Sequence, residues 1–282
     1  TSPIPRLGIP PTALTDGPAG LRIDTMREDQ SRRYYHTGFP IGTALASSWN
    51  QPLIYEVGEA IGNEAHEYGL DLIFGPGMNL HRDPLGGRNF EYYSEDPLLS
   101  GKMAAAFVRG IQSQHVGATL KHFAVNNQET NRKDVDVSIA QRPLRELYLK
   151  PFEIAVRESD PWSVMSAYNM INGQQCMESR DLLTTILRGD FGFRGFVVSD
   201  WSRGLGDVYK RQGERLGSPR MARLRPRDMG WQRPACPRYR PAAPGDQGRR
   251  QGWHPLHRRP RQLCSPYAPV CSPHRAHHPP HL

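Results

Sequence analysis

Cysteine is nearly absent from the first three quarters of this 282-residue chain, where only Cys176 occurs before residue 207. A single thiol cannot form an intramolecular bridge, so a disulfide scaffold is excluded for this part, and the redox compartment stays open. No apolar run approaches the roughly 18 residues that a membrane-spanning helix needs. The sequence therefore predicts a soluble protein with no membrane partner.

Acidic residues are scarce only near the end of the chain. The formal net charge of +8 divides into 20 Lys and Arg against 24 Asp and Glu in residues 1–206, and 16 against 4 in residues 207–282. The basic balance belongs to the second part alone, so the chain as a whole does not carry the charge pattern of a nucleic-acid-binding protein. We expect no nucleic-acid partner.

Residues 207–282 lack isoleucine and contain no lysine after Lys210, yet they hold 15 arginines and 13 of the 26 prolines. Natural disordered tails usually mix Lys, Glu, Ser and Gln. Arg, Pro, Gly, Ala and His dominate instead when GC-rich DNA is translated in a wrong frame, and residues 206–212, GDVYKRQ, resemble a translated sequencing adaptor. We interpret residues 207–282 as a disordered tail that is not part of the natural protein.

Two alternatives stay open. The tail places Trp231, Tyr239 and Trp253 among arginines, and aromatic rings in a basic segment can bind RNA or other polyanions. The chain also begins with Thr1 and shows no basic stub followed by an apolar core, so we expect its natural N-terminus, with any signal peptide, to be missing. Secretion, a periplasmic location and a cytoplasmic location all remain compatible with the sequence.

Residues 1–206 alternate short β-branched runs with stretches of helical period. Five strands are predicted, at residues 12–15, 71–74, 117–123, 162–168 and 195–200. Four predicted helices begin at Asn50, Asp96, Pro143 and Ser179, and Gly189 is expected to end the last one. Strands that alternate with helices of this length imply right-handed βαβ units and a parallel sheet covered on both faces. The predicted fold class is therefore α/β.

Chemistry-bearing residues stand at the ends of the predicted strands: Asp16, Lys121 with His122, Tyr168 with Asn169, and Asp200 with Trp201. The carboxyl ends of the strands of a (β/α)8 barrel converge on one mouth, where such residues form the site. A doubly wound sheet also binds ligands at strand ends, but no dinucleotide-type glycine fingerprint follows any strand here. We predict a TIM-barrel-like domain over residues 1–206, incomplete because it supplies only about five of eight units.

Six motifs carry a family resemblance. They are TDGPAGLR at 15–22, GGRNFEYYSEDP at 86–97, KHFAVNNQETNR at 121–132, RELYLKPF at 145–152, SVMSAYNMING at 163–173 and GFRGFVVSDW at 192–201. Together they resemble the N-terminal domain of glycoside hydrolase family 3, in its β-glucosidase-like branch. The resemblance covers roughly the first 205 residues, and six pieces in the family's order make it specific.

The resemblance implies a retaining β-glycosidase in which Asp200 is the nucleophile. A carboxylate at the end of an apolar strand is held rigidly and can attack an anomeric carbon; an aspartate that caps the next helix is the alternative. Asn126 to Glu129 replace the KHFPGHG-like stretch of the N-acetylglucosaminidase branch, which argues against that substrate. Terminal β-D-glucosides are expected, with β-xylosides, α-L-arabinosides and phosphorolysis of the same bond as alternatives.

The resemblance also implies seven substrate-binding residues: Asp16, Arg88, Lys121, His122, Met165, Tyr168 and Trp201. A charged acceptor such as Asp16 grips sugar hydroxyls selectively, although a turn role is its alternative. The three basic residues are expected as cations that keep the nucleophile ionised and fix the hydroxyls; solvated surface side chains are the alternative.

The remaining three residues are less polar. Tyr168 is expected to orient the nucleophile, Met165 to form an apolar wall and Trp201 to stack on the pyranose; core packing is the alternative for the two aromatic rings. The resemblance further implies a cis peptide bond between Lys121 and His122. No second ligand stands at metal-binding spacing from His122, and we expect neither a metal nor another cofactor.

A second carboxyl group is missing from this pattern. A retaining glycosidase needs two carboxyls about 5 to 5.5 Å apart, one to attack and one to protonate the leaving oxygen. In the family, the second carboxyl comes from the following domain. Glu91 and Glu95 are instead expected to tie their loop to the barrel and to prepare the Asp96 cap. We therefore expect this chain alone to bind its glycoside weakly, with little or no turnover.

Overall fold

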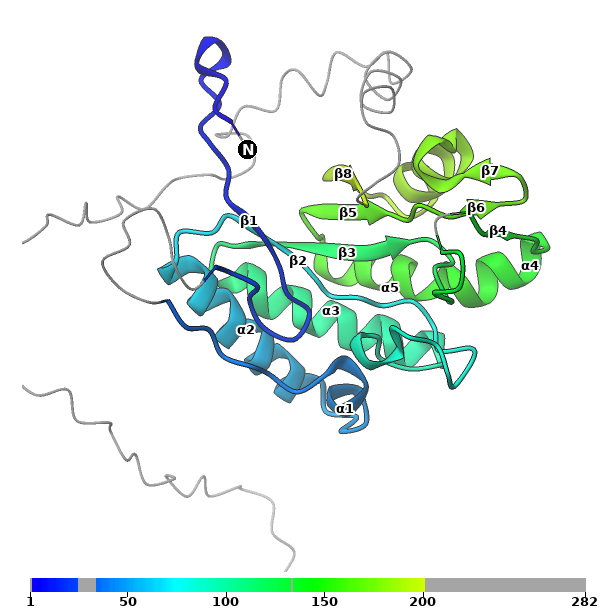
Figure 1. The fold of residues 1–282 in the computed structure, drawn as a ribbon, viewed down its shortest axis with the longest axis horizontal. Helices are drawn as coiled ribbons and strands as arrows, with labels where there is room; N and C mark the ends of the chain where they lie inside the picture. Colours follow the sequence, from blue (N-terminus) through cyan, green and yellow to red (C-terminus); the bar gives the residue numbers. More distant parts are fainter. Residues whose placement is uncertain (1, 25–33, 133, 201–282) are drawn as a thin grey trace, which may run out of the picture. The chain divides into compact units, whose positions relative to one another are not determined.

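The computed structural model describes residues 2–24, 34–132 and 134–200 (Figure 1). The predictions for Trp201 and for the tail at 207–282 lie outside the described residues. Within those ranges, no helix is both long enough and apolar enough to cross a membrane.

Five parallel strands form the main sheet, in the order β1-β2-β3-β5-β8. Their bounds are β1 Leu14–Asp16, β2 Leu72–Phe74, β3 Gly117–Phe123, β5 Ser163–Ser166 and β8 Phe196–Ser199. Each strand pairs with the next strand of this set, without the reversal of order that a doubly wound sheet shows. Within the described residues these five strands form a parallel half-barrel, which confirms the predicted α/β class and is consistent with an incomplete (β/α)8 domain.

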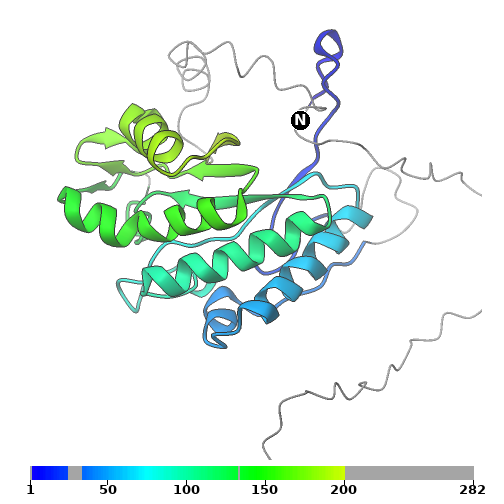
Figure 2. The same cartoon turned by 180° about the vertical axis from the view of Figure 1, so that it is seen from behind.

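The helices lie on one face of this sheet. Their bounds are α1 Gly42–Ala46, α2 Gln51–Glu67, α3 Pro97–Ser113, α4 Gln141–Pro143 and α5 Lys150–Ser159, with wider π-helical turns at Leu144–Tyr148 and Asp181–Asp190. Figures 1 and 2 show α2, α3 and α5 side by side beneath the strands. These helices cover the outer face of the sheet, and the inner face carries the strands' own side chains, as in the predicted barrel.

The core between sheet and helices is aromatic and aliphatic. Phe107 of α3, Phe123 of β3 and Phe152 of α5 are fully buried there, and the rings of Phe123 and Phe152 meet edge to face with centroids 5.1 Å apart. A separate inner-face cluster contains Leu72, Phe74 and Met165. The two clusters pack against opposite faces of the sheet.

Side-chain caps begin three of the helices as predicted. Asn50 Oδ1 accepts a hydrogen bond from the Leu53 amide, Asp96 Oδ1 from the Leu99 amide and Ser179 Oγ from the Leu182 amide. The helical path predicted from Pro143 starts slightly earlier, with α4 at Gln141. Gly189 does not end the last helix: the π-helical segment runs to Asp190, and Gly192, at φ 79°, makes the turn.

The loops differ between the two edges of the sheet. At the amino edge, the connections 68–71, 114–116, 160–162 and 191–195 contain three to five residues each. At the carboxyl edge, longer connections follow β2 and β3. A small sheet of β4 (Asp136–Val137), β6 (Met170–Ile171) and β7 (Gln174–Gln175) joins the loops after β3 and β5. The carboxyl edge therefore has the chain length needed to build a binding site.

Candidate active site

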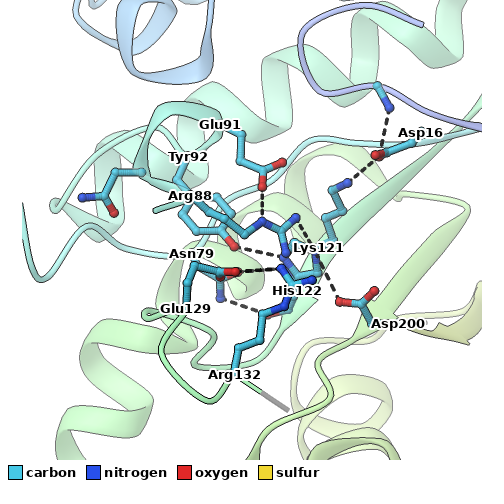
Figure 3. Close-up of polar contacts among 12 residues, drawn as sticks. Asp16, Asn79, Arg88, Glu91, Tyr92, Lys121, His122, Glu129, Arg132 and Asp200 are labelled. Atoms are coloured by element: carbon cyan, nitrogen blue, oxygen red, sulfur yellow. Dashed lines mark hydrogen bonds and ion pairs between the residues drawn. The ribbon is translucent and has the colours of Figure 1, made fainter. Parts of the chain in front are cut away.

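Asp16, Lys121, His122 and Asp200 lie together at the carboxyl edge of the sheet (Figure 3). Asp16 is the last residue of β1, Lys121 and His122 lie near the end of β3, and Asp200 directly follows β8. The Asp200 amide donates to the Ser166 carbonyl at 3.1 Å, which continues the pairing between β5 and β8. Strand pairing thus gathers residues that are far apart in the sequence.

Lys121 and Asp16 form an ion pair. Lys121 Nζ donates to Asp16 Oδ1 at 2.6 Å, and the lysine side chain is only 3% exposed. Asp16 also accepts from the Gly17 amide at 3.0 Å and contacts Arg22 Nη1 at 2.9 Å. A buried ammonium group requires such a partner, so Lys121 is not a solvated surface residue. The predicted turn role of Asp16 coexists with its polar role in the site.

His122 is held on all sides. Asn79 donates to the His122 carbonyl and accepts from its amide, both at 2.9 Å. The ring nitrogens lie 3.1 Å from the Tyr92 hydroxyl and 3.0 Å from Arg88 Nη2. The peptide bond between Lys121 and His122 is cis, as predicted.

The charge of His122 differs from the expectation. Burial, followed by the positive charges of Arg88, Lys121 and Arg132, holds the pKa of the imidazole well below its usual value. The ring is therefore neutral at neutral pH. The prediction that His122 acts as a third cation is wrong, because the sequence shows the residue type but neither its burial nor the cations around it.

Arg88 comes from the loop between β2 and α3. Its Nε pairs with the buried carboxylate of Glu91, and its guanidinium carbon lies 5.9 Å from the centroid of the Tyr92 ring. Glu91 thus pairs with a residue of its own loop, whereas the prediction was a tie from this loop to the barrel; Glu95 is exposed. Because its carboxylate is paired with Arg88, Glu91 is a poor candidate for a proton donor.

Asp200 lies beside His122 and Tyr168. Its Oδ2 is 3.6 Å from His122 Nε2, and its side chain is 13% exposed. Burial, and then the negative charge of Asp200, raise the pKa of Tyr168 to about 12, so this phenol stays protonated at neutral pH next to the carboxylate. Met165 of β5 pairs in register with Val198 of β8 and lies in the inner-face cluster.

Four side chains of this cluster were not predicted as site residues from the sequence: Asn79, Tyr92, Glu129 and Arg132 (Figure 3). Arg132 Nη1 pairs with Glu129 Oε2 at 2.7 Å, and its guanidinium carbon lies 5.5 Å from the centroid of the Tyr168 ring. Three of the four stand inside the quoted motifs, which is a usable signal. Asn79 gives none, because its partner is the backbone of a residue 43 positions away. Within the described ranges, no three His, Cys, Asp or Glu side chains gather to form a metal site.

Comparisons with known proteins place this chain in a family. The profile described as "Glycosyl hydrolase family 3 N terminal domain" matches residues 15–220. β-Glucosidase A of Butyrivibrio fibrisolvens is 52% identical over 207 residues, which are 73% of this chain and 24% of that protein. An exo-α-(1→6)-L-arabinopyranosidase of Bifidobacterium longum is 48% identical over 198 residues, 69% of this chain and 26% of its own length.

A solved structure extends the similarity to three dimensions. β-Glucosidase 3B of Thermotoga neapolitana, in complex with α-D-glucose, is 58% identical and superposes with a TM-score of 0.70, covering 71% of this chain and 28% of its own. The present chain spans about a quarter of the length of the curated relatives it matches.

Proposed function

Because this chain belongs to glycoside hydrolase family 3, we propose that it is the nucleophile-bearing part of a retaining glycosidase that hydrolyses terminal β-D-glucosyl residues. The observation that carries the proposal is the placement of Asp200 at the end of β8, with His122 Nε2 3.6 Å from its carboxylate and the Lys121–Asp16 pair on the same sheet edge. The glucose complex of the Thermotoga neapolitana relative supports the choice of sugar.

The reaction has two displacement steps. The Asp200 carboxylate attacks the anomeric carbon; an ester bond forms as the bond to the leaving oxygen breaks, and that oxygen takes a proton from an acid. Water then gives a proton to the conjugate base of that acid and attacks the same carbon, so the ester bond breaks, the sugar leaves and Asp200 returns to its carboxylate form. We place the acid outside residues 1–206, because the nearby Glu91 is paired with Arg88. The chain alone is proposed to turn over little or no substrate.

The surrounding side chains hold the sugar. Asp16 offers carboxylate oxygens to hydroxyl groups, and Lys121 and Arg88 supply positive charge and donors beside the nucleophile. Tyr168 keeps its proton and can donate to the Asp200 carboxylate, while Met165 closes the apolar side. His122 completes the polar wall, and Trp201, whose position is not described, is proposed to stack on the ring.

An activated glycoside tests the nucleophile in this chain. A dinitrophenyl 2-deoxy-2-fluoro-β-D-glucoside has a leaving group that departs without protonation, so the missing acid is not needed. We expect the protein mass to rise by one fluoroglucosyl group and peptide mapping to place the ester on Asp200. Asp200→Asn should take no label, whereas Asp190→Asn, at an exposed carboxylate paired with Arg145, should label normally. Label on another side chain, or full labelling of Asp200→Asn, contradicts the proposal.

The arabinopyranosidase relative makes α-L-arabinopyranosides the second candidate substrate class. Free glucose and free L-arabinose can be compared as protectors against the labelling reaction. Glucose should slow labelling at lower concentration if the site is built for glucosides; stronger protection by arabinose would favour the second class.

A further inference from the structure

The small sheet ties together two loops that leave the main sheet at different strands. β4 lies in the connection after β3, and the hairpin of β6 and β7 lies in the connection after β5 (Figure 1). β4 pairs with β6 in parallel and β6 with β7 antiparallel, and each of these strands contains only two residues. An isolated hairpin is at best marginally stable in water, so other contacts are needed to hold β4 against it.

Asn172 supplies such contacts from the tip of the hairpin. Its Oδ1 accepts a hydrogen bond from the Ile139 amide, and its Nδ2 donates to the Ile139 carbonyl, both at 2.9 Å. Its own backbone amide donates to the Val137 carbonyl at 3.1 Å. A primary amide side chain offers both a donor and an acceptor, as a peptide group does. The Asn172 side chain therefore continues the pairing of β4 with β6 beyond the last backbone pair.

The hairpin turn presents this side chain. Asn172 has a φ of 49° and Gly173 a φ of 79°, both in the left-handed region, as a two-residue turn of type I′ requires. The Gly173 amide donates to Asp136 Oδ1 at 2.9 Å, which ties the turn to β4 a second time. The turn explains why asparagine or glycine is needed at this position, but either residue would satisfy it. The pairing with both backbone groups of Ile139 is specific to the asparagine side chain.

The tied segments are close in sequence to two side chains of the site. The Met170 amide donates to the Val135 carbonyl at 2.8 Å, and Tyr168 and Arg132 stand two and three positions before these residues. The Arg132 guanidinium carbon lies 5.5 Å from the centroid of the Tyr168 ring. Arg132 is exposed, and its ion-pair partner Glu129 belongs to the same loop. Because an exposed arginine has many rotamers available, its place over the ring depends on how the two loops are held.

We propose that Asn172 is a positioning residue. Its side-chain amide clasps the loop after β3 to the hairpin after β5, and this clasp keeps the Arg132 guanidinium over the Tyr168 ring. Asp136 assists through the Gly173 amide. The effect on the sugar reaction rests on the proposed function, whereas the clasp between the two loops does not.

The clasp can be tested without any sugar. Asn172→Gly removes the side chain but keeps the turn, because glycine adopts a positive φ freely. Asn131→Gly is the matched control: Asn131 is exposed at a φ of 51°, and its side chain makes no hydrogen bond within the described residues. NMR hydrogen exchange at the Ile139 amide should become roughly tenfold faster or more in Asn172→Gly, through loss of two hydrogen bonds. It should not change in Asn131→Gly.

A spectroscopic signature reports the position of Arg132. Protons of a side chain that lies over an aromatic ring resonate upfield, so the Arg132 side chain should show this shift in the wild type and lose it in Tyr168→Leu. Asn172→Gly should reduce the shift, and Asn131→Gly should keep it. Unchanged exchange at Ile139, or a full ring-current shift in Asn172→Gly, overturns the proposal.

The labelling reaction then measures the consequence for the site. Asn172→Gly should slow labelling by the fluoroglucoside roughly threefold to tenfold, the loss typical of one or two neutral hydrogen bonds, whereas Asn131→Gly should label like the wild type. Asp136→Ala should also slow labelling. Asp136→Asn, whose side-chain oxygen can still accept from the Gly173 amide, should restore the rate. Equal rates in the two glycine variants contradict the positioning role.

The proposed function and the clasp fail separately. A wild-type chain that takes no label contradicts the proposed function, and the exchange and ring-current measurements still decide whether Asn172 holds the two loops. Faster exchange at Ile139 in Asn172→Gly, with an unchanged Arg132 shift and an unchanged labelling rate, would show that the clasp does not position Arg132.

Discussion

The helix-covered face of the sheet and its carboxyl edge are stabilised by different interactions. On the helix-covered face, Phe107, Phe123 and Phe152 pack without polar partners. At the carboxyl edge, Lys121 and His122 are just as buried, yet each needs a specific partner: Asp16 for the ammonium group, and Asn79, Tyr92 and Arg88 for the histidine. Burial on one side gives stability, whereas on the other it positions charge.

This difference has a physical origin. Apolar burial is non-directional and scales with the area removed from water, so stability on the helix-covered face depends on how much apolar area is buried and how closely it packs. Buried charges and hydrogen bonds are directional and costly when unmade. Substitutions on the helix-covered face should therefore change the free energy of unfolding, and substitutions at the carboxyl edge should change sugar binding.

The largest effect is expected for Phe107→Ala. Removing a fully buried ring from α3 leaves a cavity in the core between the sheet and the helices, and should lower the free energy of unfolding by about 3–5 kcal/mol. Urea denaturation measures this loss. Phe90→Ala, which removes a 47% exposed ring, should cost far less. The labelling rate of the folded Phe107→Ala protein should match the wild type; a large fall would break the division between the two regions.

Lys121→Met tests the carboxyl edge of the sheet. The change removes a buried charge and its bond to Asp16, but Asp16 keeps Arg22 and the Gly17 amide as partners. Loss of a charge-assisted hydrogen bond of about 1.5–3 kcal/mol should weaken sugar binding roughly tenfold to a hundredfold. Unfolding should be affected less than in Phe107→Ala. Lys102→Met, at an exposed pair with Glu158, is the control; equal effects of the two lysines would contradict the prediction.

The helix-covered face was largely predictable from the sequence, and the edge only in part. Periodic apolar residues and the caps at Asn50 and Asp96 mark the helices locally. The run of residues 117–123 likewise predicted β3 with its observed bounds. The family motifs identified Asp16, Lys121 and Asp200, and strand pairing brings them together. The role of Asn79 and the neutral state of His122 depend on contacts between residues that are more than 30 positions apart, which no local pattern encodes.

The choice of a barrel over an open sheet could be made from the sequence only indirectly. Alternating strands and helices occur both in open sheets, which are covered by helices on both faces, and in barrels, which are covered by helices outside only. The order β1-β2-β3-β5-β8 decides between them, and that order is a property of strand pairing. The stop at Gly189 failed because Gly192 takes the positive φ that ends the segment.

Acid should weaken the fold through His122. Burial and the nearby cations hold its folded pKa well below the ordinary value of 6.5, so the unfolded chain takes up a proton below that pH while the folded chain does not. Stability contributed by the neutral ring is therefore lost as the pH falls below 6.5, by at most about 1.4 kcal/mol per pH unit. Urea midpoints between pH 8 and pH 5 measure this slope.

The control variants isolate the histidine responsible. His122→Gln should flatten the slope between pH 6.5 and pH 5, whereas His66→Gln, at an exposed position, should leave it unchanged. An unaltered slope in His122→Gln would mean that the ring can be protonated in the folded state, and would remove the contrast between buried apolar and buried polar residues.

The smallest change in the free energy of unfolding is expected for Asp96→Ala. This variant also tests whether the helix-covered face and the carboxyl edge are independent. Asp96 caps α3 and ends the loop that carries Arg88 and Tyr92, so it lies where the two regions meet. Loss of the cap should lower the free energy of unfolding by about 1 kcal/mol, as should Asn50→Ala at the start of α2. The labelling rate should not change in either variant, because Thr43 and Glu91 hold the Arg88 loop independently of the cap. Slower labelling in Asp96→Ala but not in Asn50→Ala would show that the stability of α3 is transmitted to the carboxyl edge.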